Sequence, residues 1–193
     1  MKFYRSVSRV LAGLAFASFV SGASMTAAIA ATPSVIVIVN SEQLFGQSKV
    51  GQNVRTQIQA LAKKLQAEGK KSEDALKAEA KKLSEQRALL SEADFGKKVQ
   101  AFEQKQQDLQ RTMQEKGQEL QLGSNKARGE IEAAIRPIFA DVMKKHGANI
   151  LLDQSVVLAG GVDLDVTAEV LKALDAKLTT VDVKPVPLSS LKQ

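Results

Sequence analysis

The fold is decided by residues 95–120, which read FGKKVQAFEQKQQDLQRTMQEKGQEL. Side chains that alternate four and three residues apart form one register along this stretch, which is apolar except at two polar positions. This pattern is typical of a helix that packs lengthwise on another helix. The register consists of Phe95, Val99, Phe102, Gln106, Leu109, Met113, Lys116 and Leu120. The stretch predicts a long helix whose narrow apolar stripe needs a partner.

A second stripe precedes the first and supplies that partner. It starts at Val54, Ile58, Leu61 and Leu65, and continues less regularly through Leu76, Leu83 and Leu90. A break is expected near Leu89–Glu92, because Ser91 can cap a new helix and Asp94 stands at its third position. Residues 42–89 and 92–146 then form an antiparallel hairpin, with the tip near 89–92. At about 1.5 Å per residue, its arms are about 70 and 80 Å long.

Short apolar runs flank the hairpin. The β-branched run Val35–Val39 predicts a strand that is covered on both faces, followed by helix N-caps at Asn40 and Ser41. Ile150–Asp153 and Val156–Leu158 predict a strand pair, with a short third strand at Val162–Leu164. We therefore expect residues 31–41 and 147–179 to form one small β-rich body, and the fold class to be α+β.

The C-terminal part is predicted to contain one more helix and a tail. Thr167 is expected to cap the helix, whose apolar side carries Val170, Leu171, Leu174 and Leu178. Two prolines exclude regular structure in the sequence VKPVP at 183–187, so residues 180–193 are interpreted as a mobile tail. In the returning helix, Pro137 predicts a kink. Gly117, Gly123 and Gly129 are either tolerated surface positions or points where the arm flexes.

The N-terminus has the organisation of an export signal. Lys2, Arg5 and Arg9 precede the apolar run Val10–Val20, and Ala28-Ile29-Ala30 matches the A-x-A cleavage pattern. We predict a signal peptide over residues 1–30, cleaved near Ala30 or Ala31, and a periplasmic location. The chain has no cysteine, which excludes a lipid-anchored lipoprotein, disulfides and thiolate metal sites.

Cleavage changes the composition of the chain. The whole sequence carries 27 basic and 21 acidic residues, and loss of three basic leader residues lowers the net charge from +6 to +3. The only tyrosine, Tyr4, leaves with the leader, and there is no tryptophan. Roughly 163 residues remain, too many of them in the long helices to build a large core in one chain. We therefore expect an oligomer.

The order of these features resembles the Skp (OmpH-like) family of periplasmic chaperones. The resemblance covers residues 34–178 and rests on Val39-Asn40, Leu44-Phe45, Ala101–Gln104, Ile150–Asp153 and Asp165–Lys172. It implies a homotrimer in which strands of three chains form a β-barrel body and three hairpins surround a cavity. It also implies an ATP-independent chaperone that holds unfolded outer-membrane proteins. The number three comes from the resemblance alone.

The resemblance implies that apolar side chains on the arms bind the client. Outer-membrane strands alternate apolar and polar residues, and such surfaces can hold them through weak, interchangeable contacts. The alternative is that the same side chains pack the hairpin itself, which is the stronger expectation for Val99, Phe102 and Leu109. The candidate residues are Leu76, Leu83, Leu89, Leu90, Phe95, Val99, Phe102, Leu109 and Met113.

The outer part of the first arm is basic, with seven lysines against four acidic residues. These lysines could attract acidic clients, lipopolysaccharide or an anionic membrane surface from a distance. The alternative is a solvated face with helical Glu–Lys pairs. Nucleic acid is not expected as a partner, because no aromatic residues alternate with the lysines. The seven are Lys63, Lys64, Lys70, Lys71, Lys77, Lys81 and Lys82.

No catalytic or metal-binding pattern emerges. His146 is the only histidine, and Asp163 and Asp165 lack the glutamate spacing of a calcium loop. Ser155 has no general base at a recognisable spacing. We predict a protein that is not an enzyme and needs no cofactor or metal. Two other classes remain open: an envelope adaptor with a bridging hairpin, and a trimeric coiled-coil spacer.

Overall fold

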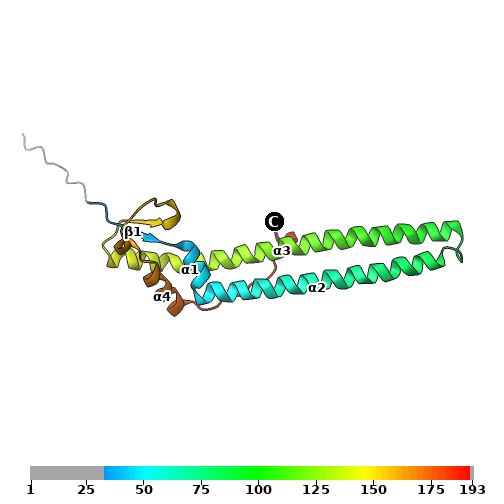
Figure 1. Cartoon of the computed structure of the whole chain (residues 1–193), viewed down its shortest axis with the longest axis horizontal. Coiled ribbons are helices and arrows are strands. Elements are labelled where there is room, and N and C mark those ends of the chain that lie inside the picture. Colours follow the sequence, from blue (N-terminus) through cyan, green and yellow to red (C-terminus); the bar gives the residue numbers. More distant parts are fainter. Residues whose placement is uncertain (1–32, 192–193) are drawn as a thin grey trace, which may run out of the picture. The chain divides into compact units, whose positions relative to one another are not determined.

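The computed structural model describes residues 33–191, so the predicted leader lies outside the described residues, as do Ala31 and Thr32. The elements are β1 (Ile36–Val39), α1 (Ser41–Gln47), α2 (Lys49–Gln86), α3 (Glu92–Lys145), β2 (Ile150–Asp153) and α4 (Thr167–Lys177). Short 3-10 helices occupy Gln154–Val156, Val162–Leu164 and Leu188–Leu191. Figure 1 shows α2 and α3 running side by side as an antiparallel hairpin. The α+β class predicted from the sequence is confirmed.

The sheet joins the two ends of the hairpin. β1 and β2 pair in parallel, with Ile36 opposite Ile150 and Val39 opposite Asp153. Val37, Ile38 and Val39 are all buried, so this strand is covered on both faces as predicted. The predicted pairing of 150–153 with 156–158 is wrong, as is the third strand at 162–164. Asp153 ends the strand, because its carboxylate accepts the N–H groups of Ser155 and Ser41 at 2.9 and 3.2 Å.

The helix after β1 is broken at Ser48, so the first arm begins at Lys49 and not at residue 42. Asn40 caps α1 by accepting the N–H of Gln43 at 2.7 Å. Ser48 then caps α2 by accepting the N–H of Gly51 at 3.1 Å, and its side chain is fully buried. Leu44 of α1 is 1% exposed. α1 therefore belongs to the body and not to the arm.

The hairpin turns over residues 87–91, where the sequence predicted a break near Leu89–Glu92. Ser91 caps α3 by accepting the N–H of Asp94 at 3.2 Å. α3 continues through Pro137 as one helix of 54 residues, about 81 Å long at about 1.5 Å per residue. It ends at Lys145, and His146 is its C-cap. Gly147 follows with a positive φ of 60°, the conformation that glycine adopts readily just after a helix.

The core lies at the sheet end of the hairpin. Ala127, Ile131, Ile135, Ile138 and Val142 form one buried stripe on α3. This stripe packs with β1, with Leu44 and Val50, and with Val170 and Leu174 of α4. Thr167 begins α4 without capping it: Asp165 accepts the Thr167 N–H at 2.8 Å instead.

The C-terminal segment packs on the hairpin. Val181 and Val183 are 7% and 5% exposed and belong to the core. The interpretation of residues 180–193 as a mobile tail is therefore wrong for residues 181–188, which are held on the hairpin by Val181, Val183 and the bonds of Val186 and Leu188 to Glu119. Proline lacks a backbone hydrogen-bond donor and disfavours regular structure, but it does not prevent an extended segment from binding to a groove.

Candidate functional site

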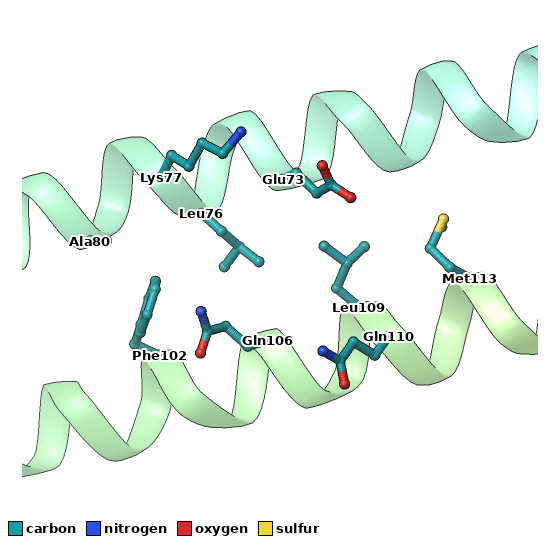
Figure 2. A pocket seen from close by; sticks show the side chains of 9 residues that line it. All are labelled: Glu73, Leu76, Lys77, Ala80, Phe102, Gln106, Leu109, Gln110 and Met113. Atoms are coloured by element: carbon teal, nitrogen blue, oxygen red, sulfur yellow. The ribbon is translucent and has the colours of Figure 1, made fainter.

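The predicted apolar residues of α2 and α3 face each other across a hollow in the outer half of the hairpin. Figure 2 shows Leu76 of α2 pointing between Phe102 and Leu109 of α3, with Met113 farther along the same side of α3. These four residues line a hollow of about 480 Å³ together with Ala80 and polar side chains. Each of the four side chains is half-buried. Apolar surface therefore remains accessible between the helices.

The other candidate residues lie farther toward the turn. Leu83, Leu90, Phe95 and Val99 are half-buried, whereas Leu89 is 83% exposed at the turn itself. The guanidinium carbon of Arg87 lies 5.7 Å from the centroid of the Phe95 ring, which is within cation–π range. Half-burial fits both packing of the hairpin and contact with another chain, so the client-binding role stays a prediction. Leu89 has the least packing of the nine.

Polar pairs cross between the helices in one register. Lys98 donates to Gln86 at 2.7 Å, Lys105 contacts Glu79, and Lys116 contacts Glu68 at 2.7 Å. The three pairs are seven and eleven residues apart on both helices, which is close to two and three helical turns. They therefore lie along one line and share one register between the two helices.

One of these pairs explains two irregularities of the sequence pattern. Glu68 and Lys116 interrupt the apolar stripes of their helices, and the structure places them opposite each other. The hydrogen bond and charge of Lys116 lower the pKa of Glu68. In the sequence, Lys116 stands only as a polar position in the register of the second helix. The register that brings it opposite Glu68 depends on where the chain turns.

The seven lysines of the first arm are all exposed. Of these seven lysines, only Lys77 pairs with an acid among the described residues, at 3.6 Å from Asp74. The helical Glu–Lys pairs of the alternative interpretation are therefore not formed by the other six lysines within residues 33–191. Attraction of an anionic partner stays a prediction.

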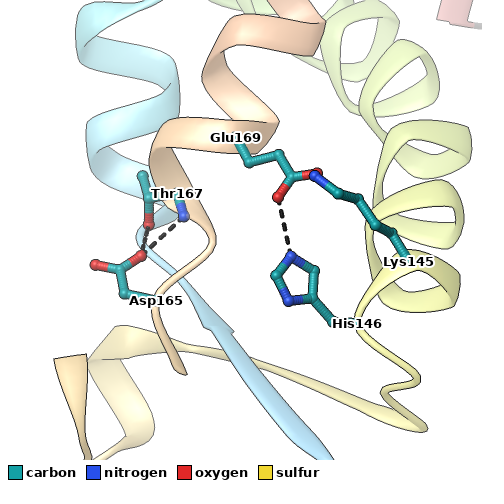
Figure 3. Close-up of polar contacts among 5 residues, drawn as sticks. All are labelled: Lys145, His146, Asp165, Thr167 and Glu169. Atoms are coloured by element: carbon teal, nitrogen blue, oxygen red, sulfur yellow. Dashed lines mark hydrogen bonds and ion pairs between the residues drawn. The ribbon is translucent and has the colours of Figure 1, made fainter. Parts of the chain in front are cut away.

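At the other end of the hairpin, His146 and Lys145 join α3 to α4 (Figure 3). His146 Nε2 lies 2.9 Å from Glu169, and Lys145 Nζ lies 2.7 Å from the other oxygen of the same carboxylate. The hydrogen bonds from His146 and then Lys145 lower the pKa of Glu169. Among residues 33–191 no three acidic or histidine side chains gather as metal ligands. Asp165 bonds to Thr167, at the start of α4.

Two further features were not predicted from the sequence. Val156, Leu158 and Val162, beside the sheet, are 68%, 105% and 92% exposed. The C-terminal segment, residues 180–188, bridges α2 and α3; we call it the strap. Alternating valines in the sequence of the strap were the only signal that could have indicated an extended, half-covered segment.

A family model described as Outer membrane protein (OmpH-like) matches residues 35–174. The chain belongs to the OmpH-like family. Its structure is similar to the crystal structure of a "putative outer membrane chaperone (OmpH-like)" from Caulobacter crescentus CB15, with a TM-score of 0.76 and 22% identity. The match covers 83% of this chain and 95% of that chain, and it shows a shared fold. None of the curated proteins compared with this OmpH-like chain matches it. Within residues 33–191, no helix has the length and apolar character needed to cross a membrane.

Proposed function

We propose that this chain is an ATP-independent holdase chaperone of the periplasm that captures unfolded outer-membrane proteins between its helical arms. The observation that carries the proposal is the half-buried apolar lining of the open hollow between α2 and α3. A stable helical hairpin normally closes such a surface by packing. Here Leu76, Phe102 and Leu109 remain accessible to an incoming strand with apolar residues on one face. The family membership and the fold of the Caulobacter protein agree with this role.

We also propose that the working form is a homotrimer whose sheets join in a β-barrel body. Within residues 33–191 no further strand pairs with the outer edge of β2, whereas β1 has only a single bridge, between Ile38 and Asp165, on its other side. An isolated sheet of two strands is marginally stable in water. Val156, Leu158 and Val162 expose apolar surface beside it. Contact between copies would cover both features.

The test dilutes a urea-unfolded, tryptophan-containing outer-membrane protein into buffer with and without the mature chain. Because the mature chain contains neither Trp nor Tyr, tryptophan emission reports on the client alone. The holdase proposal expects suppressed light scattering and a shifted client emission that saturates near one client per oligomer. Unchanged aggregation at an excess of the chain would contradict the proposal and favour an envelope adaptor or spacer.

A further inference from the structure

The strap is held by hydrogen bonds to its backbone groups. The Gln57 side-chain amide donates to Val181 O at 2.8 Å and accepts the Val183 N–H at 2.9 Å. These two bonds are the pair that a neighbouring β-strand would offer to an extended segment. From α3, Glu119 accepts the Val186 N–H through its backbone oxygen at 2.9 Å. An extended chain therefore binds here without any bond to the side chains of the strap.

The side chains of the strap alternate. Val181 and Val183 are buried, whereas the side chains of Asp182 and Lys184 are 78% and 82% exposed and lie 3.3 Å from each other. Only the apolar positions enter the groove between α2 and α3. Such a groove selects for apolar side chains two residues apart and tolerates any polar residue between them.

Gly123 makes the close approach of the strap possible. A Cβ at this position would lie 2.2 Å from the backbone oxygen of Lys184. A Cβ at Gly117 or Gly129, in the same helix, would have no such neighbour within 4 Å. Beyond the strap the groove continues as an open hollow of about 190 Å³ that is lined in part by Leu61, Leu120 and Pro185.

We propose that the groove between Gln57 and Gly123 is a binding site for extended peptides with apolar residues at alternate positions. Residues 180–188 occupy this site as a tethered ligand that can be displaced. A short tether gives a high effective concentration, so an external peptide binds only weakly while the strap is in place. Strands of unfolded outer-membrane proteins have the matching alternation, and naming them as the external ligand rests on the proposed function.

The test releases the strap and leaves the groove intact. In the full mature chain, Val181→Asp with Val183→Asp places two charges in buried positions and should detach the strap. A fluorescent peptide with the natural sequence of residues 180–193 is then added, and its anisotropy is measured. We expect binding at least about tenfold tighter than to the unaltered chain. Adding Gly123→Ala should abolish this binding, whereas adding Gly129→Ala should leave it unchanged.

The proposal would be contradicted if the peptide did not bind the strap-released chain while that chain remained helical. It would also be contradicted if the peptide bound the strap-released chain and the unaltered chain equally well. If the released chain loses its far-UV helical signal, hydrogen exchange on full chains with a native strap decides instead. Gly123→Ala should then speed exchange of the Val183 amide by at least about tenfold, and Gly129→Ala should not. Equal exchange rates of the Val183 amide in the two variants would overturn the proposal. Peptide binding in a chain that fails to hold clients would contradict the proposed function and leave this site standing.

Discussion

Gly51 lies where the first turn of α2 passes the end of α1. A Cβ there would come within 1.8 Å of the backbone oxygen of Phe45, so the two helices approach closely only because this residue is glycine. We expect Gly51→Ala to lower the free energy of unfolding by about 1–3 kcal/mol, the usual cost of overpacking. The measurement is urea unfolding followed by circular dichroism at equal protomer concentrations. Gly117→Ala, in open surroundings, should instead raise stability by about 0.5–1 kcal/mol.

Replacing the two capping serines by alanine should lower the free energy of unfolding by different amounts in the same assay. Ser48 is fully buried and caps α2, whereas Ser91 caps α3 at the exposed turn. Ser48→Ala should cost at least about 1 kcal/mol of unfolding free energy, because it also leaves a buried N–H without its acceptor. Ser91→Ala should cost less, since water can replace the lost bond. Equal losses would show that burial of the cap is not what matters.

At the scale of the helices, the pair Glu68–Lys116 stabilises the hairpin only while Glu68 is charged. Its pKa is lower in the folded chain than the ordinary 4.5, chiefly through the Lys116 hydrogen bond. The pair therefore contributes fully to the free energy of unfolding at pH values above the ordinary carboxyl pKa. This contribution is lost as the pH falls through the pKa that Glu68 has in the folded chain. We expect Glu68→Gln to lower the melting temperature slightly at pH 7 and to have no effect at strongly acid pH.

A matched control separates this pair from general charge effects. Glu103 is an exposed glutamate of α3 that makes no ion pair among the described residues. Glu103→Gln should leave the melting temperature nearly unchanged at both pH values. Because the Glu68 pair lies at the surface, 1 M salt should also shrink the effect of Glu68→Gln. An effect independent of both pH and salt would rule out the ion pair as its cause.

At the scale of the whole molecule, the exposed residues beside the sheet test the proposed assembly. Leu158→Asp with Val162→Asp should shift the chain from oligomer to monomer in analytical ultracentrifugation, because charges would have to be buried in the contact. Leu89→Asp is the control. Leu89 is likewise exposed in one chain, at 83%, but it lies at the turn of the hairpin and not beside the sheet. If both changes leave the sedimentation coefficient unaltered, the contact between copies lies elsewhere.

The arm lysines are tested through the rate of client capture. Replacing Lys70, Lys71, Lys81 and Lys82 by glutamine should slow capture at low salt and flatten its salt dependence, because long-range attraction is screened by ions. Lys172→Gln with Lys177→Gln, in α4, is the control and should change the rate little. Stopped-flow client fluorescence measures both. A capture rate that does not depend on salt in the unaltered chain would exclude steering by charge.

Local patterns in the sequence were sufficient to predict the separate helices and the first strand. The four–three spacing from Phe95 to Leu120 predicts the returning helix, Ser91 its start, and the run Val35–Val39 a covered strand, because each signal lies within a few residues of its effect. The same local signals placed the α+β class. They also carried the resemblance to the OmpH-like family, which the family model confirms.

Contacts between residues far apart in the sequence could be found only from the folded chain. Parallel pairing of β1 with β2, the facing of Glu68 and Lys116, and the seating of the strap on Gly123 join positions up to more than a hundred residues apart. Such contacts depend on where the hairpin turns and how its helices are registered, and no local pattern encodes that. Gly123 therefore looks like Gly117 and Gly129 in the sequence, although among these three only Gly123 has a neighbour within 4 Å that requires it to lack a side chain.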